Sequence, residues 1–372
     1  MSKFLQLLFT LLSLTVINVK ADESISQPPI SENKNSTRPD FRIINGVEAS
    51  YSQFPFTVFI YSDLIGSGAV CGGTLIAPNV VITAAHCLYD GVVPISKYTM
   101  YVSAGSVYNI ENNNDMYFVS RSIPHPSYSP RTAANDIGIL ILSDSTTVSP
   151  SDFAKIYDLP ISNDFTTAAA GWGKTSNDIN DSISDVLMTV PLVLSSSSNC
   201  KKFNPRYTNN DGMVICTENK NSQDTCYGDS GGPFVYTGVS PYPLLGVTSF
   251  GNSPAAAAAA AASDPYSKEK PACADIDGYG FYTHVYYYID WIVSSTSLDK
   301  NSITYSKKDS APAPSKVTPP SISQSSRLPS DVLSTQAAAQ KDISAGISLK
   351  HQSGIISMAV VSHILLIIFA LF

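Results

Sequence analysis

Charged side chains are scarce in this sequence: Asp, Glu, Lys and Arg make up 14% of its 372 residues. Basic residues are outnumbered by acidic ones, 23 against 30, and the formal net charge is -7. The lack of a basic excess argues against nucleic acid as a partner, because phosphate binding needs a basic face. The sequence also has no ligand spacing typical of a metal site. Its many Tyr, Ser, Thr, Asn and Pro residues favour an all-β secreted protein over a helical one.

The number of cysteines is even, so no cysteine need remain unpaired. The six cysteines are an even number, which fits three disulfide bonds in an oxidising compartment, although the count alone leaves their pairing open. They are Cys71, Cys87, Cys200, Cys216, Cys226 and Cys273.

The N-terminal segment indicates such a compartment. Residues 1–21 have a short basic start, an uncharged apolar run and a small residue, Ala21, at the expected cleavage position. This pattern is typical of a secretory signal peptide, with a buried helix as the alternative. Residues 22–42 are polar, contain three prolines and lack an apolar period, so we interpret them as an activation propeptide.

Residues 43–297 have the composition of a folded domain. Short runs rich in Val, Ile, Tyr and Thr, such as "FTVFIYS" (56–62) and "DIGILIL" (136–142), are separated by Gly, Pro, Asn and Asp. The pattern predicts many short strands in a sandwich or in barrels. Apolar residues at helical spacing in "YYYIDWIVSS" (286–295) predict a C-terminal helix.

The C-terminal part changes character twice. Residues 298–350 are rich in Ser and Pro and predict a disordered stalk, since this composition cannot bury enough apolar surface to fold. Residues 351–372 end in an apolar run with no basic residue behind it. Small residues at 344–346 ahead of that run favour a lipid-anchor (GPI) signal over a transmembrane tail. A third alternative is that the segment is neither.

The stretch "DTCYGDSGGP" (224–233) places a serine among glycines, which predicts a tight loop that approaches something closely. Acyl transfer needs a nucleophile, a base, a group that orients the base, and donors for the oxyanion. Ser230 is the candidate nucleophile, and the N–H groups of Gly228 and Ser230 are candidate oxyanion donors.

The other two roles need a histidine and a buried carboxylate. Asp136 opens an apolar run, where a charge is costly without a partner, and is the candidate carboxylate. Five histidines are available as the base: His86, His125, His284, His351 and His363.

Five motifs decide among them. They occur in order at 43–50 ("IINGVEAS"), 72–87 ("GGTLIAPNVVITAAHC"), 135–142 ("NDIGILIL"), 171–173 ("GWG") and 228–234 ("GDSGGPF"). Residues 43–297 therefore resemble a chymotrypsin-like (trypsin-type) serine protease. The resemblance implies two six-stranded antiparallel β-barrels followed by a C-terminal helix. It also implies a triad of His86, Asp136 and Ser230 with no cofactor or metal.

The resemblance further implies a disulfide pattern and an activation step. The pairs would be Cys71–Cys87, Cys200–Cys216 and Cys226–Cys273. Cleavage after Arg42 would free the ammonium group of Ile43, which would pair with the buried Asp229 and hold the oxyanion loop in its working shape.

The same resemblance assigns the primary specificity pocket. Asp224 would lie at its floor and bind Arg or Lys of the substrate, as in trypsin-type enzymes. Gly251 and Gly280 match the glycines that keep this pocket open. Ser249, with its two following residues, would run antiparallel to the substrate backbone.

Some features depart from the family pattern. Residues 252–272 form a long insertion with eight consecutive alanines, which we interpret as tolerated low complexity, with restriction of large substrates as the alternative. Tyr279 replaces a usual proline, and in some members a tyrosine here accompanies sodium binding, which the sequence leaves open. The calcium loop lacks its acidic ligand, so we expect no structural calcium. Asn180 carries a glycosylation sequon.

The sequence thus predicts a secreted zymogen of a monomeric endopeptidase, tethered to the cell surface through its C-terminal anchor. Its partners would be an activating protease and protein or peptide substrates with Arg or Lys. The alternative is a catalytically silent homologue used for binding or adhesion.

Overall fold

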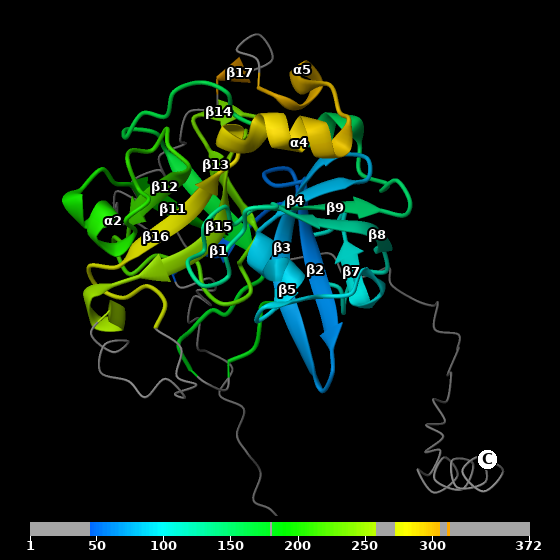
Figure 1. Cartoon of the computed structure of the whole chain (residues 1–372), viewed down its shortest axis with the longest axis horizontal. Coiled ribbons are helices and arrows are strands. Elements are labelled where there is room, and N and C mark those ends of the chain that lie inside the picture. The colour runs from blue at the N-terminus through cyan, green and yellow to red at the C-terminus, as the bar shows by residue number, and fades with distance from the viewer. Residues whose placement is uncertain (1–44, 179–180, 258–271, 306–310, 313–372) are drawn as a thin grey trace, which may run out of the picture. The chain divides into compact units, whose positions relative to one another are not determined.

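The computed structural model describes residues 45–178, 181–257, 272–305 and 311–312 (Figure 1). The chain divides into one unit of residues 1–315 and a second of residues 316–372. The predictions for the signal peptide, the propeptide with Arg42, Ile43, Asn180 and the C-terminal anchor lie outside the described residues. Among the described residues no helix is both long enough and apolar enough to cross a membrane.

Six strands of the first half close into an antiparallel barrel. The apolar runs predicted as strands pair side by side in it, for example Val81 with Leu140 and Ile82 with Ile139, and these four side chains are fully buried. In barrel order the strands are β2 (Thr57–Leu64), β3 (Ser67–Ala77), β4 (Val80–Thr83), β9 (Gly138–Leu142), β8 (Met116–Pro124) and β7 (Met100–Ser103).

Six strands of the second half form the other barrel, which closes where Val193 and Leu194 pair with Glu218 and Thr217. A short strand, β1 (Val47–Glu48), adds to its outside. The order is β11 (Met188–Leu194), β10 (Thr167–Gly171), β13 (Pro233–Tyr236), β15 (Leu244–Asn252), β16 (Tyr279–His284) and β12 (Val214–Glu218). The predicted pair of six-stranded antiparallel barrels is confirmed.

Aromatic side chains join the two barrels and fill the second. Phe59 of β2 meets Trp172, which follows β10, edge to face at 5.5 Å between ring centroids. Both rings are 1% exposed. In the second barrel Phe234 stacks on Tyr282 at 4.3 Å. Aromatic pairs of this kind add to the stabilisation from burial alone, so the two barrels pack as one body.

Few helices accompany the barrels. The predicted C-terminal helix is present as α4 (Ile289–Thr296), which buries Ile289 and Ile292 and ends at Ser297 with a left-handed φ of 60°. A one-turn helix, α2 (Ser198–Phe203), carries Cys200.

The packed domain extends past the predicted boundary at residue 297. A short helix, α5 (Lys300–Ile303), begins at Asp299, whose side chain accepts the Ser302 N–H. Ile303 is 1% exposed, and the main chain of Ile156 bonds the backbone of Ile303 and of Tyr305 at 2.8 and 2.7 Å. The stretch 298–305, which the sequence analysis placed in the stalk, packs on the domain through Leu298, Ile303 and Tyr305.

His284 at the end of β16 makes stability depend on pH. The ring is 4% exposed, its Nδ1 bonds the Gly212 carbonyl at 2.9 Å, and its Nε2 is buried with no hydrogen-bond partner among the described residues. Burial lowers the pKa of His284, so in the folded state the ring remains neutral at a pH where the unfolded ring is protonated.

We expect the free energy of unfolding to fall as the pH drops below about 6.5, since the unfolded chain then binds a proton that the folded chain resists. Urea unfolding of His284→Phe against the unaltered chain, from pH 8 to pH 5, measures this. The variant should lose less stability across that range, and equal losses would contradict the role of His284.

Candidate active site

Two paired strands bring His86 and Asp136 together. His86 lies in a 3-10 turn (Ala85–Leu88) just after β4, and Asp136 lies just before β9. Because Thr83 of β4 is paired with Gly138 of β9, the two residues meet at the same end of the barrel. The Cys71–Cys87 disulfide ties the histidine turn to β3.

Asp136 fixes the orientation of the imidazole. The carboxylate is 1% exposed and accepts the His86 backbone N–H at Oδ1 (2.8 Å). Its Oδ2 lies 2.8 Å from His86 Nδ1 and accepts the Ser249 hydroxyl at 2.5 Å. With Nδ1 directed at the carboxylate, Nε2 is left as the basic nitrogen.

His86 and Asp136 shift the pKa values of one another. Burial, the largest single effect, would lower the pKa of His86, but the charge of Asp136 and the hydrogen bond to it together outweigh burial, so the pKa is raised. Burial would raise the pKa of Asp136, but the attraction of His86 and the hydrogen bonds hold it below its usual range. The arrangement therefore stabilises an imidazolium beside a carboxylate.

Ser230 lies on a loop that only glycines can complete. A Cβ on Gly231, where φ is +79°, would be 2.5 Å from the Gly72 carbonyl oxygen. The same loop is tied to β3 by a hydrogen bond from the Gly72 N–H to the Ser230 carbonyl, 2.7 Å long. The hydroxyl of Ser230 is thereby presented to the cleft between the barrels.

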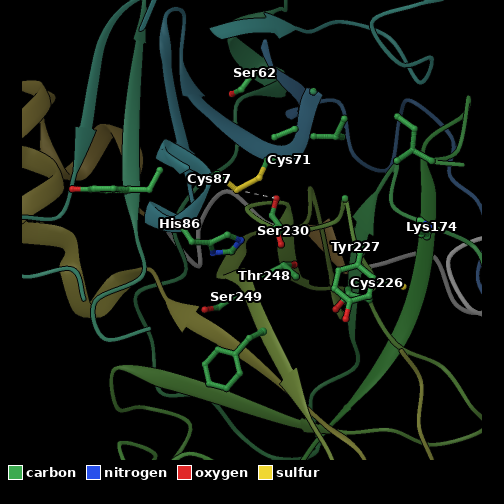
Figure 2. A pocket seen from close by; sticks show the side chains of 18 of the residues that line it. Ser62, Cys71, His86, Cys87, Lys174, Cys226, Tyr227, Ser230, Thr248 and Ser249 are labelled. Atoms are coloured by element: carbon green, nitrogen blue, oxygen red, sulfur yellow. Dashed lines mark hydrogen bonds between the residues drawn. A yellow bond between two sulfur atoms is a disulfide. The ribbon is translucent and has the colours of Figure 1, made fainter. Parts of the chain in front are cut away.

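His86 and Ser230 line one cavity of about 690 Å³ (Figure 2). Within the described part of the chain no hydrogen bond joins their side chains, so they face one another as unbonded neighbours. Catalytic hydrogen bonds are often long until substrate is bound. Gly228, with φ at +103°, borders the same cavity. No hydrogen bond to another described residue uses the N–H of Gly228 or of Ser230, which leaves both free for an oxyanion.

Asp224 lies in a second cavity, of about 260 Å³, which shares the wall residues Thr225, Tyr227, Phe250 and Cys273 with the first. The carboxylate is 6% exposed, and burial raises its pKa to about 6.

Neutral donors surround the Asp224 carboxylate. It accepts hydrogen bonds from Asn219 Nδ2 (2.9 Å) and from the N–H groups of Thr225 (2.8 Å) and Ala274 (3.3 Å). No Lys or Arg among the described residues pairs with it, so the cavity offers a negative charge that a cationic ligand would neutralise.

The two glycines assigned to this pocket differ in position. Gly251 faces the cavity, and a Cβ there would come 3.9 Å from Asp224 Oδ2. Gly280 is not among the residues that line it. A Cβ on Gly280 would lie 2.6 Å from Thr217 Oγ1 and 3.1 Å from the Tyr282 ring, so glycine there serves packing behind the pocket.

Sequence reasoning missed several contacts of the site. Ser249 was expected beside the substrate backbone, and it does border the cavity, but its hydroxyl also bonds Asp136 from 113 positions away. Asn219 and Asp275 line the Asp224 cavity without any sequence signal. Only the pairing of β15 and β16 with their neighbours brings these residues to the site.

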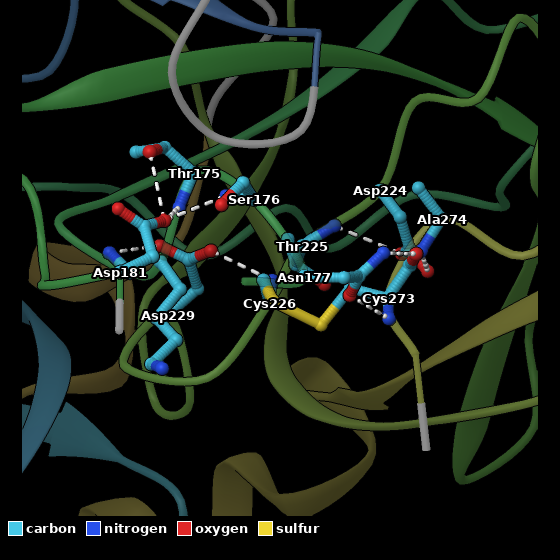
Figure 3. Close-up of a disulfide and its surroundings, with 12 residues drawn as sticks. Thr175, Ser176, Asn177, Asp181, Asp224, Thr225, Cys226, Asp229, Cys273 and Ala274 are labelled. Carbon is cyan, nitrogen blue, oxygen red and sulfur yellow. Dashed lines mark hydrogen bonds between the residues drawn. A yellow bond between two sulfur atoms is a disulfide. The ribbon is translucent and has the colours of Figure 1, made fainter. Parts of the chain in front are cut away.

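Asp229 directly precedes Ser230 and is fully buried. Figure 3 shows it beside Cys226 of the same loop. Its two oxygens accept the N–H groups of Gly173 and Cys226, each at 2.8 Å. Burial raises its pKa to about 7. Asn45, two residues after Ile43, donates its amide to the Ser222 carbonyl at 2.8 Å, so the chain after the expected cleavage point lies against this loop region.

The disulfides pair as the resemblance implied: Cys71–Cys87, Cys200–Cys216 and Cys226–Cys273. Among the described residues, one cluster could be taken for a metal site, Cys71, His86 and Cys87. Both sulfurs are in a disulfide and the imidazole is bonded to Asp136, so this cluster does not suit a metal ion.

The sequence of the chain is similar to those of known proteins. The family model described as Trypsin matches residues 43–292. Glandular kallikrein-10 of Rattus norvegicus is 31% identical over 266 residues, covering 68% of this chain and 88% of the relative. Trypsin of Saccharopolyspora erythraea is 32% identical over 209 residues (56% and 86%), and Trypsin delta of Drosophila erecta 35% over 215 (57% and 79%). The chain belongs to the trypsin family of serine endopeptidases.

Proposed function

We propose that the protein is the secreted zymogen of an endopeptidase that cleaves peptide bonds after Arg or Lys. The observation that carries the proposal is the buried Asp224, which lies in a cavity next to that of Ser230 and has no basic partner among the described residues. A buried carboxylate is costly without a cation. The ammonium or guanidinium of a substrate Lys or Arg would supply that cation, and the carbonyl carbon of the same residue would then lie beside Ser230.

The proposed reaction is an acyl transfer to Ser230, and the His86–Asp136 hydrogen bond supports it. Ser230 Oγ attacks the carbonyl carbon, and His86 Nε2 takes the hydroxyl proton while Asp136 stabilises the imidazolium. The N–H groups of Gly228 and Ser230 stabilise the oxyanion. The imidazolium then protonates the leaving amine, and water, activated by the neutral ring, releases the acyl group from Ser230.

Activation depends on Asp229. Cleavage after Arg42 would give Ile43 a free ammonium group. The carboxylate of Asp229 is fully buried in the loop that holds Ser230 and has only neutral donors among the described residues. Their ion pair would fix the loop that carries the oxyanion donors. A separate activating protease would make the cut.

The proposed location is the cell surface. If residues 351–372 are a GPI signal, they would be removed and replaced by a lipid attached upstream of them, and if they are a transmembrane tail, they would themselves hold the secreted enzyme in the membrane. The protease domain is monomeric in this proposal, and the Ser/Pro-rich segment joins it to the tail in the sequence.

Substrate preference tests the proposal directly. The chain cleaved after Arg42 should hydrolyse short amides with Arg or Lys before the scissile bond. Asp224→Ser should lower kcat/KM for both by about 10³-fold or more, because a charged group would then enter a pocket without its partner. Ser230→Ala is the blank. Equal cleavage after apolar residues would contradict the role of Asp224, and no cleavage of any amide would favour a silent homologue.

Asp136→Asn tests the triad. We expect kcat to fall about 10⁴-fold with little change in KM, because the amide favours the wrong imidazole tautomer. Ser249→Ala is the matched control: it removes one hydrogen bond to the same carboxylate and should cost about tenfold or less. A similar loss in both variants would mean that general packing around Asp136, and not the tautomer, limits the rate.

The raised pKa of Asp229 predicts that the stability of the uncleaved chain and that of the cleaved chain depend differently on pH. Because its pKa rises from 3.8 to about 7 on folding, the folded uncleaved chain keeps a proton that the unfolded chain loses. Its stability should therefore fall as the pH rises through this window. In the cleaved chain the Ile43 ammonium should remove most of that fall.

Unfolding of both forms between pH 4 and pH 8, in the Ser230→Ala background, measures the effect, with Asp229→Asn as the control that cannot titrate. Parallel curves for the two forms would contradict the ion pair.

A further inference from the structure

The insertion at residues 252–272 borders the primary pocket at both of its described ends. Ala256 and Ala272 line the 260 Å³ cavity that contains Asp224. The sequence favoured a tolerated insertion without a role. An insertion without a role would not need specific contacts at its ends. The contacts found at both ends therefore point to a role for this segment.

The start of the insertion is held by Ser253. This residue follows β15 directly and is 3% exposed. Its hydroxyl donates to Asp275 Oδ2 at 2.6 Å and accepts the Ala256 N–H at 3.0 Å. Residues 254–257 are helical, so Ser253 caps this turn while Asp275 holds the cap.

The end of the insertion is held by Asn177, which lies on a different loop. Asn177 Oδ1 accepts the Cys273 N–H at 2.8 Å, and its Nδ2 donates to the Cys273 carbonyl at 3.0 Å. The Cys226–Cys273 disulfide fixes the same residue to the loop of Ser230 (Figure 3). Both ends are therefore anchored to the walls of the pocket.

We propose that the first turn of the insertion, residues 253–257, is an additional wall of the substrate pocket, and that Ser253 and Asp275 are the positioning residues that hold it there. The inference rests on the proposed function. The methyl group of Ala256 packs along the aliphatic stem of the substrate Arg or Lys while Asp224 binds its charge. A stem contact is present equally in the bound substrate and in the transition state, so it acts on KM and not on kcat.

Four variants of the chain cleaved after Arg42, assayed with Arg and Lys amides, test this. Ser253→Ala and Asp275→Ala should raise KM about tenfold, the scale of one lost apolar contact, and leave kcat unchanged. Asp275→Asn, whose amide oxygen still accepts the Ser253 hydroxyl, should restore KM toward that of the unaltered chain. Ala256→Leu, which fills the pocket without touching the cap, should raise KM for both substrates.

An unchanged KM in Ser253→Ala, Asp275→Ala and Ala256→Leu would overturn the inference. So would a joint fall in kcat and thermal stability in the first two with no effect of Ala256→Leu, because that pattern describes a purely structural cap. If the unaltered chain cleaves no Arg or Lys amide, the proposed function fails first, so the two failures are distinguishable.

Discussion

Asp136 is 1% exposed and receives three hydrogen bonds, two from His86 and one from Ser249. A carboxylate this deeply buried is stable as an anion only while those donors remain in place. The donors come from both barrels: His86 follows a strand of the first, and Ser249 lies in a strand of the second. The Asp136 carbonyl also accepts the Thr283 hydroxyl of the second barrel at 2.8 Å. The charge that orients the catalytic base therefore also joins the barrels at the cleft, and separating them would leave it unpaired.

Two further buried carboxylates, Asp224 and Asp229, lie on the loop that ends at Ser230. Each has a raised pKa, chiefly through burial, and the charge of Asp224 adds to the rise at Asp229. Each holds only neutral donors among the described residues. The proposal assigns one cation to each, the new N-terminus to Asp229 and the substrate side chain to Asp224. Since either cation relieves the repulsion between the carboxylates, activation and substrate binding would favour one another.

Local sequence patterns predicted most of the architecture. The apolar runs became strands, while the two barrels and the disulfide pairs that the structure contains were implied by the resemblance to the protease family. What the sequence missed depends on distant contacts: Ser249 on Asp136, Asn177 on Cys273, and Ile303 on Ile156. Serine and asparagine are common in turns and loops, and the residues next to Ser249 and Asn177 in the sequence give no sign of these distant partners. Their partners are set by strand register and by the closing of the barrels, which local composition does not determine.

The most direct test of the account is labelling of the nucleophile. The full secreted chain, before and after cleavage behind Arg42, would be treated with a fluorophosphonate, and intact-mass and peptide spectra would locate the adduct. The account predicts one adduct, on Ser230, formed rapidly only in the cleaved chain and absent from His86→Ala. An adduct elsewhere, or none in the cleaved chain, would contradict the claim that His86, Asp136 and Ser230 form a working triad.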